Sequence, residues 1–217
     1  MTKLLAIETT GSVCGVSVMI DGSLRSASEI LQANVHDEML AGCVKYCLHT
    51  AGMDASQLTV VALSSGPGSF TGLRIGAAFA KGLCFESDCK LLAVPTMTSL
   101  YYAGLEVAEI AGCTQISGVI ASHRDLFYVQ NMPLGTTPWS TLPKLLERSS
   151  IGQYDATSTL VVGPAAGEFT SKPISGLHRL SPRFVSHAAW HMLKSGAAFS
   201  DPLTFEPLYG QDFEPRV

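Results

Sequence analysis

The chain has 217 residues, of which 47% are hydrophobic and 15% are charged, and its formal net charge is −4. This composition supplies enough apolar side chain for a sizeable core and excludes a disordered chain. The basic residues are scattered as singletons from Lys3 to Arg216, without a run or a stripe. We therefore expect no tight binding of nucleic acid by the chain alone.

The cysteines and the N-terminal residues bear on the cellular compartment. None of the six cysteines forms a C-x-x-C pair, so we expect reduced thiols packed as small hydrophobic side chains. The apolar run Leu4–Ile7 is interrupted by Glu8 and is too short for the hydrophobic part of a signal peptide. No stretch of the sequence reaches membrane-spanning length. The expectation is a soluble protein of the reducing cytoplasm, without a membrane association.

The N-terminal segment predicts three strands joined by tight turns. Residues 3–8 form a short apolar run that ends in an acid, and residues 13–20 are rich in β-branched side chains. Asp21-Gly22 between two apolar segments is typical of a hairpin turn, so residues 23–31 supply the returning strand.

Helices and buried strands alternate over the rest of the first half. From Asp37 onward, apolar residues recur at intervals of three and four as far as the stop at Gly52, which predicts an amphipathic helix. The apolar runs at 60–63 and 91–94 lack polar alternation, as strands buried on both faces do. Two further helices are expected at residues 70–86 and 96–111.

The second half repeats this pattern more loosely. Its expected elements are two strands around a turn, a helix, a buried strand and a final helix, at residues 116–122, 126–132, 140–148, 160–163 and 183–196. The prolines that follow Ser200 predict an irregular tail. Two related α/β halves imply a duplicated mixed-sheet fold with a cleft between the halves.

Residues 64–82, SSGPGSFTGLRIGAAFAKG, combine a strand end, a Gly-Pro-Gly turn and a helix rich in small residues. Gly66 and Gly68 permit backbone angles and close approaches that other residues resist. Ser69 or Thr71 is placed to cap the helix, whose first N–H groups form a potential anion or phosphate site. The small residues leave the helix thin enough for another backbone to lie against it. A tight turn with a closely packed helix explains the same glycines without a ligand.

The string GPGSFTGLRIG, followed by AKGL, resembles the signature of the bacterial TsaB (YeaZ) family. The N-terminal LLAIETTGSVCGVSV resembles the opening strand and turn of the same family. The resemblance covers about residues 1–100 well and the remainder loosely. It implies the duplicated actin/sugar-kinase/Hsp70-like (ribonuclease H-like) α/β fold, with a first lobe over residues 1–104 and a smaller, divergent second lobe over residues 105–217.

The resemblance also implies a function in the threonylcarbamoyl modification of tRNA. TsaB proteins pair with the catalytic relative TsaD, which binds a metal and transfers threonylcarbamoyl from an adenylate to an adenosine of tRNA. A small ATPase, TsaE, completes the assembly. By this resemblance the chain is a non-catalytic activating subunit that binds no cofactor alone, reaches tRNA only through the complex and is able to form a homodimer. The implied ATP and metal belong to the complex.

The place of the metal motif of the TsaD relatives lacks ligand side chains in this sequence. Residues 94–104, VPTMTSLYYAG, contain no His, Cys, Asp or Glu, and a divalent metal needs several such ligands. His187 and His191 stand four apart on a predicted helix, but no Glu follows His187 as it does in a zinc-binding H-E-x-x-H pattern. We therefore expect neither a metal site nor a catalytic residue.

Three departures from the family pattern weaken the case for independent nucleotide or substrate binding. Arg124 is present before the second hairpin strand, but Ala121 occupies the place of the acid in an Asp-x-Arg-like element. The late glycine turn reads GPAAG at 163–167, with fewer glycines than a loop that grips a nucleotide. The family's C-terminal Pro-x-Tyr-Leu-Arg pattern survives only as PLYG at 207–210.

Two sets of residues are candidates for function. The turn set, for a nucleotide, a phosphate or a complex interface, comprises Glu8, Gly66, Pro67, Gly68, Ser69, Thr71 and Arg74. The interface set lies on the first two predicted helices and comprises Met39, Cys43, Val44, Cys47, Leu48, Gly72, Gly76, Phe79 and Ala80. The alternative function is that of a small-molecule kinase or a metallopeptidase of the same fold. The kinase would need a catalytic acid in the second lobe and intact phosphate turns.

Overall fold

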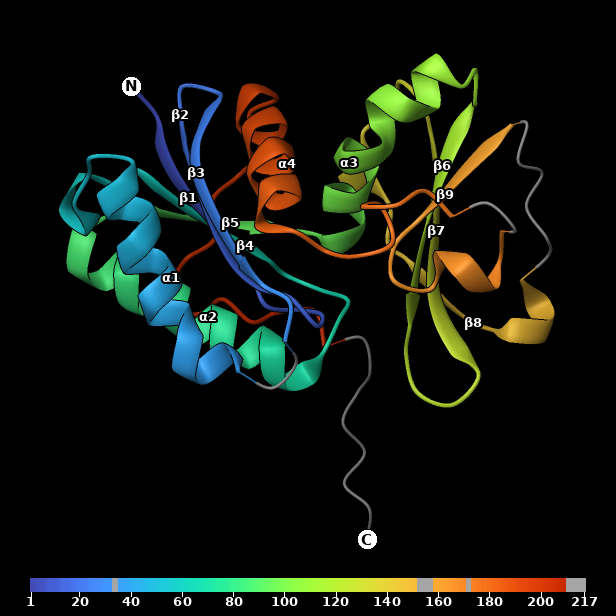
Figure 1. Cartoon of the computed structure of the whole chain (residues 1–217), viewed down its shortest axis with the longest axis horizontal. Helices are drawn as coiled ribbons and strands as arrows, with labels where there is room; N and C mark the ends of the chain where they lie inside the picture. The colour runs from blue at the N-terminus through green and yellow to red at the C-terminus, as the bar shows by residue number, and fades with distance from the viewer. Residues whose placement is uncertain (33–34, 152–157, 171–172, 210–217) are drawn as a thin grey trace, which may run out of the picture.

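The computed structural model describes residues 1–32, 35–151, 158–170 and 173–209, and it contains two sheets with helices packed around and between them (Figure 1). The strands are β1 (Lys3–Glu8), β2 (Cys14–Ile20), β3 (Ser23–Ile30), β4 (Val60–Ser64), β5 (Lys90–Val94), β6 (Gln115–Ala121), β7 (Leu126–Pro133), β8 (Lys144–Glu147) and β9 (Thr159–Val162). The α-helices are α1 (His36–Thr50), α2 (Phe70–Ser87), α3 (Thr96–Ile110) and α4 (Pro182–Lys194). Within the described residues, no helix combines the length and the apolar character that crossing a membrane requires.

The first sheet has the strand order β3-β2-β1-β4-β5. β2 pairs antiparallel with both β1 and β3, whereas β1, β4 and β5 run parallel. β1 is buried from Leu4 to Glu8, because helices cover both faces of the sheet, and this burial explains its apolar run without alternation. The turn at Asp21-Gly22 joins β2 to β3 with both residues at positive φ, so the predicted hairpin is confirmed.

The second sheet repeats the connectivity of the first. Its strand order is β8-β7-β6-β9. β6 pairs antiparallel with β7 and parallel with β9, as β1 pairs with β2 and β4. The predicted duplication of a mixed α/β sheet is therefore confirmed, and the second sheet is smaller by one strand in the described part of the chain.

The helices divide the interior into separate cores. α1 and α2 cover one face of the first sheet and α4 covers the other (Figure 1). Because neighbouring residues of a strand face opposite sides, Leu5 packs toward α1 and α2, whereas Leu4 packs toward α4 with Val185. α3 packs on the second sheet and also against α4, so these two helices form the contact between the lobes.

The first lobe is built from both ends of the chain. α4 and the residues that follow it return to the first sheet, where Ser200 forms a bridge with Leu91 of β5. The boundary expected at residue 104 falls inside α3, a helix that packs on the second sheet. The two lobes are therefore a spatial division that a single cut in the sequence does not reproduce.

The helix predicted at residues 140–148 is wrong. This stretch contains β8 between two short 3-10 turns, η2 (Pro138–Ser140) and η3 (Arg148–Ser150). β8 pairs antiparallel with β7, with Leu145 opposite Tyr128, so strand pairing outweighs the helical propensity of the Lys-Leu-Leu-Glu run. The remaining predicted helices and strands are confirmed, with small shifts of their ends.

Candidate functional site

The glycine turn connects the end of β4 to the start of α2. Gly66 has a φ of 108°, a conformation that favours glycine, and its peptide bond to Pro67 is cis. Ser69 is the N-cap of α2, and its hydroxyl accepts a hydrogen bond of 3.3 Å from the Gly72 N–H. Of the two capping residues that the sequence allows, the structure uses Ser69.

The loop between β1 and β2 lies directly on the first turns of α2. The Ser69 N–H donates to the Thr10 carbonyl at 2.7 Å, and the Thr9 hydroxyl donates to the Gly72 carbonyl at 2.8 Å. A Cβ at Gly72 would overlap the Thr9 carbonyl oxygen, and one at Gly76 would overlap the Thr9 hydroxyl. The close backbone approach that the small residues predict is therefore present, and the approaching backbone belongs to the same chain.

The C-terminal tail crosses the other side of the glycine turn. The Leu208 N–H donates to the Ser65 carbonyl at 2.7 Å, and a Cβ at Gly66 would overlap the Leu208 carbonyl oxygen. The Tyr209 ring lies 4.9 Å from the ring of Phe70, at the start of α2. The turn is thus enclosed between two segments of its own chain. Packing against these segments explains why glycines are needed on both sides of the turn.

Glu8 is fully buried at the end of β1, next to this turn. Its carboxylate accepts hydrogen bonds from the Thr10 N–H and the Thr10 hydroxyl, both at 2.6 Å, and from the Ser64 hydroxyl. Burial raises the pKa of Glu8 above 4.5, against the opposing effect of these hydrogen bonds. The acid ties the β1–β2 loop to the end of β4, and all three donors come from the chain itself.

A hollow of about 270 Å³ lies where α1 and α2 begin. Its lining residues are Gly11, His36, Asp37, Ser69, Thr71, Gly72 and Ile75. Two helix N-termini favour an anion at such a place, but the Asp37 carboxylate lines the same hollow and repels one. The His36 ring lies 3.1 Å from the Gly11 carbonyl oxygen, so one of its nitrogens is already engaged. Of the turn set, only Ser69 and Thr71 line this hollow.

Arg74 makes a different kind of contact from the other residues of the turn set. Its guanidinium lies 5.4 Å from the centre of the Phe70 ring, on the exposed side of α2. Such a cation–π contact favours a fixed position for both side chains. The turn set therefore divides into residues that join segments of the chain and residues that face solvent.

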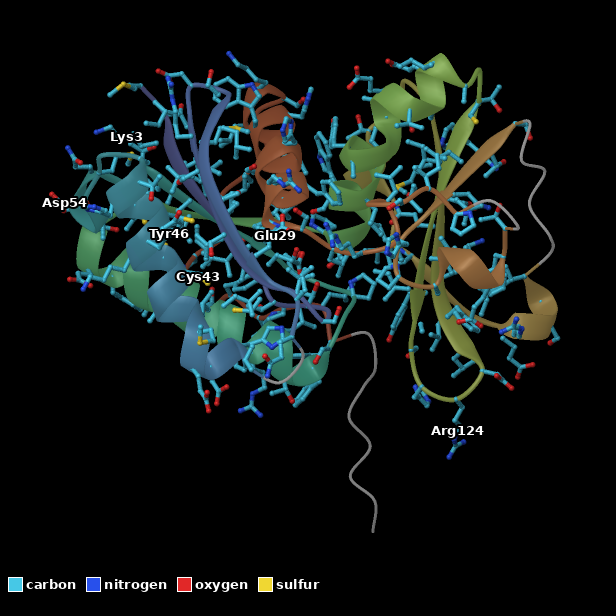
Figure 2. All side chains as sticks on the ribbon, viewed as in Figure 1. Lys3, Glu29, Cys43, Tyr46, Asp54 and Arg124 are labelled. Atoms are coloured by element: carbon cyan, nitrogen blue, oxygen red, sulfur yellow. The ribbon has the colours of Figure 1, made fainter. Side chains whose placement is uncertain are left out.

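The interface set also divides into buried residues and residues that are at least partly exposed. Met39 is 41% exposed on α1, and Phe79 is partly buried on α2. The remaining members are buried, either in the core between these helices and the first sheet or beneath the β1–β2 loop: Cys43, Val44, Cys47, Leu48, Gly72, Gly76 and Ala80. Tyr46, labelled beside Cys43 on α1 in Figure 2, is 59% exposed and was not among the candidates.

The start of α3 lies within residues 94–104, where the resemblance to TsaD implies the place of a metal motif. Its hydroxyls are buried without a hydrogen-bond partner in the described part of the chain, at Thr96, Thr98 and Ser99. Uncharged hydroxyls alone are a poor ligand set for a divalent metal. Across residues 1–32, 35–151, 158–170 and 173–209, no three His, Cys, Asp or Glu side chains are grouped so that they could hold a metal ion.

The two histidines of α4, His187 and His191, lie against different neighbours in the structure. The His191 ring stacks on Tyr102 of α3, with ring centres 4.2 Å apart, at the contact between the lobes. His187 lines a hollow of about 420 Å³ together with Leu24 of β3 and Val107 of α3. Burial lowers the pKa of both histidines, so both are neutral at pH 7.

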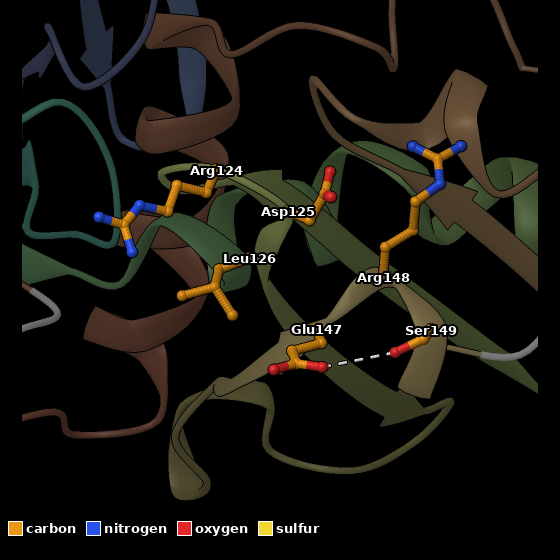
Figure 3. A pocket seen from close by; sticks show the side chains of 6 residues that line it. All are labelled: Arg124, Asp125, Leu126, Glu147, Arg148 and Ser149. Atoms are coloured by element: carbon orange, nitrogen blue, oxygen red, sulfur yellow. Dashed lines mark hydrogen bonds between the residues drawn. The ribbon is translucent and has the colours of Figure 1, made fainter.

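The second lobe contains an open hollow of about 740 Å³ that sequence reasoning missed (Figure 3). It lies beside the turn between β6 and β7, and its lining residues are Arg124, Asp125, Leu126, Glu147, Arg148 and Ser149. Arg148 pairs with Glu168 and stands 5.6 Å from the centre of the Phe169 ring. The hollow depends on β8, whose pairing with β7 brings Glu147 opposite Leu126, so the incorrect helix prediction concealed it.

Two solved structures share the fold of the whole chain. One is titled as an uncharacterized protein with similarity to peptidase YEAZ from Pseudomonas aeruginosa. It is 22% identical, with a TM-score of 0.76, over 96% of this chain and 99% of that chain. The other, YeaZ from Pseudomonas aeruginosa, has a TM-score of 0.73 at 22% identity. The duplicated sheets, the glycine turn and these likenesses define a two-lobed protein with the actin/sugar-kinase/Hsp70-like fold.

Sequence relatives of the chain carry names from the threonylcarbamoyl modification of tRNA. The family model described as TsaD: tRNA N6-adenosine threonylcarbamoyltransferase matches residues 30–131. The tRNA threonylcarbamoyladenosine biosynthesis protein TsaB from Haemophilus influenzae is 27% identical over 127 residues, which cover 58% of this chain and 52% of that protein. TsaB from Escherichia coli is 31% identical over 98 residues, which cover 45% and 42%. The chain thus matches about half the length of these curated TsaB proteins, to which its sequence is similar.

Replacement of Gly72 by Ala tests the contact between the β1–β2 loop and α2. The added methyl group would overlap the Thr9 carbonyl oxygen, so we expect the free energy of unfolding to fall by at least about 2 kcal/mol. Gly82→Ala is the matched control in the same helix, because nothing lies within 4 Å of its added Cβ. We expect this control to gain about 0.5–1 kcal/mol. Urea denaturation measures both variants, and equal stabilities would contradict the contact.

The Glu8→Gln variant tests the cost of ionising a buried acid. Because burial raises the pKa of Glu8 above 4.5, the folded protein keeps this proton at pH values where the unfolded chain loses it. The stability that the proton provides is present below the unfolded pKa and is lost as the pH rises through the folded pKa. Urea denaturation from about pH 4 to about pH 8 should therefore show the wild type losing stability relative to Glu8→Gln. A difference between the two proteins that is constant with pH would argue against an ionisation cost.

Proposed function

We propose that the chain is a non-catalytic subunit of the machinery that makes N6-threonylcarbamoyladenosine in tRNA, and that it docks on a catalytic TsaD-type subunit in the cytoplasm. The names of the curated TsaB relatives support the process, and the match of the transferase family model supports a partner of the same fold. Two subunits with the same fold can pair through equivalent helices about a pseudo-two-fold axis. A TsaE-like ATPase, ATP and a metal are proposed for the assembly and not for this chain alone.

The observation that carries the proposal is the outer surface of α1 and α2. Exposed apolar and small residues there follow helical spacing on both helices. We name this surface the outer stripe, and it comprises Met39, Gly42, Tyr46, Ala78, Gly82 and Phe85. Apolar side chains exposed together on neighbouring helices are typical of a surface that another protein covers.

Two glycines of the outer stripe have open space beside them in the part of the chain that the structure describes. A Cβ at Gly42 or at Gly82 would meet nothing within 4 Å, and both residues lie within helices without positive φ. A glycine within a helix destabilises it by about 0.5–1 kcal/mol relative to alanine. The close approach of a partner helix explains both positions, because only small residues allow two helix backbones to come together.

The glycine turn supports this surface in the proposal. Its contacts with Thr9, Thr10 and Leu208 fix the start of α2 and therefore the direction of the outer stripe. Since the Ser69 N–H already donates to Thr10, a phosphate at this turn would find fewer donors than the first turn of a helix offers. We therefore propose that the turn set acts through the shape of the interface.

The substitution Ala78→Arg tests the outer stripe. A charged side chain at the centre of a helix contact is buried without a partner, so we expect the affinity for a TsaD homologue to fall about 100-fold or more. Arginine is a good helix former at an exposed position, so the monomer should remain folded by circular dichroism. Ile110→Arg is the control, because Ile110 is also an apolar residue on a helix, 81% exposed, at the end of α3 and outside the outer stripe. Equal affinities of the two variants would place the interface elsewhere.

The isolated chain should neither modify tRNA nor bind it tightly. We expect no threonylcarbamoyl transfer, no ATP turnover and no peptide cleavage by the purified protein, and only weak tRNA binding at physiological salt because the net charge is −4 without a basic cluster in the sequence. Addition of a TsaD homologue should produce the tRNA complex. ATP turnover by the chain alone would support the kinase alternative, and peptide cleavage would support the metallopeptidase alternative. Submicromolar tRNA binding by the chain alone would reveal a basic face formed on folding.

A further inference from the structure

Two thiols lie against each other at the C-terminal end of α2. Cys84 is in the last turns of the helix, Cys89 immediately precedes β5, and their Sγ atoms are 3.5 Å apart. Asp88 stands between them in a left-handed conformation, with a φ of 51°, and turns the chain back on itself. The end of α2, its cap at Asp88 and the start of β5 therefore hold Cys84 and Cys89, which are five residues apart, in hydrogen-bond contact.

The two thiols differ in acidity. The hydrogen bond between the two thiols lowers the pKa of Cys89 to about 6, against the opposing effect of burial, and the Ser87 side chain adds to the lowering. The same hydrogen bond, with burial, raises the pKa of Cys84. The lowered pKa favours Cys89 as the thiol of the pair that attacks first.

The other cysteines in the α1–α2 core provide a contrast. Burial raises the pKa of Cys14 to about 12 and that of Cys47 to about 11, so both remain protonated at neutral pH. A protonated, buried thiol is a poor nucleophile. Two thiols are also too few for a structural zinc site, which takes four ligands. The contact of Cys84 with Cys89 combines a distance of 3.5 Å between the sulfur atoms with a lowered pKa of one thiol, and this combination suits thiol–disulfide exchange.

We propose that Cys84 and Cys89 form a redox modification site, where a low-molecular-weight disulfide such as glutathione disulfide converts the two thiols to an intramolecular disulfide. The Cys89 thiolate attacks one glutathione sulfur and releases the first glutathione. Cys84 then attacks the Cys89 sulfur, loses its proton and releases the second glutathione. The two protein thiols are oxidised, one glutathione disulfide is reduced to two glutathiones, and both protons end on them.

The surroundings allow this reaction. The neighbours Phe85, Glu86 and Asp88 are exposed, so opening of the last helical turn admits the reagent although both thiols are buried. The sulfur atoms then need to approach from 3.5 Å to the roughly 2.0 Å of a disulfide bond. The site does not depend on the proposed partner, because every group in it belongs to this chain.

The test uses the native full chain and glutathione disulfide. After exposure, the protein is unfolded in urea with N-ethylmaleimide and digested with trypsin, which places the pair alone in the peptide 82–90 and each other cysteine in a separate peptide. We expect the peptide 82–90 to lack maleimide and to be lighter than the dithiol by two hydrogen atoms, whereas the other cysteines are blocked. A peptide 82–90 that carries two maleimides, while an added reference dithiol is oxidised, overturns the proposal.

Serine variants identify the nucleophile. Cys84→Ser should retain glutathione on Cys89, because the second attack cannot occur, whereas Cys89→Ser should leave Cys84 unmodified. Cys113→Ser is the matched control, since Cys113 lies in the core of the second lobe, and it should form the disulfide as the wild type does. Glutathione on Cys84 in Cys89→Ser, with none on Cys89 in Cys84→Ser, contradicts the assigned order of attack. The wild-type digest decides the proposal even where a variant fails to fold.

Discussion

The contact between the β1–β2 loop and the first turns of α2 is the constraint on which the first lobe depends. Thr9 and Thr10 bond to Gly72 and Ser69, and the glycines along this side of α2 leave room for the loop backbone. Glu8, buried beneath it, ties the loop to the end of β4. A motif that reads as a phosphate-binding turn in sequence is thus occupied by the chain's own backbone, and this occupation sets the position of α2.

That position has consequences for the opposite side of the helix. With its inner side against the sheet and the loop, α2 lies beside α1 and leaves the outer stripe exposed. The small residues of the motif thus fall into two groups with different physical reasons. Gly72 and Gly76 leave room for the loop, whereas a Cβ added at Gly82 would meet no other part of the described chain within 4 Å. The second group is the one that a docking partner would explain.

Much of the fold could be predicted from the sequence, because its signals are local. The hairpin at Asp21-Gly22, the buried strands and the helical spacings each depend on neighbouring residues. The strand β8 could not be predicted, since its four residues become a strand only through pairing with β7. The candidate site was harder for the same reason. The sequence shows that Gly66 needs space, but Leu208, which lies far along the chain, is what fills it. Which residues of a helix are exposed can also be read only from the packed structure: on α1, Tyr46 is exposed and Cys43 is buried.

Hydrogen–deuterium exchange of the chain, with and without a TsaD homologue, tests the central claim that the first lobe docks through α1 and α2. Amides that a partner covers exchange more slowly, and the effect can be located by peptide. The account predicts added protection in the peptides of α1 and α2, with the hollow beside Arg124 in the second lobe unchanged. Protection confined to the second lobe, with α1 and α2 exchanging as they do in the free chain, would contradict it.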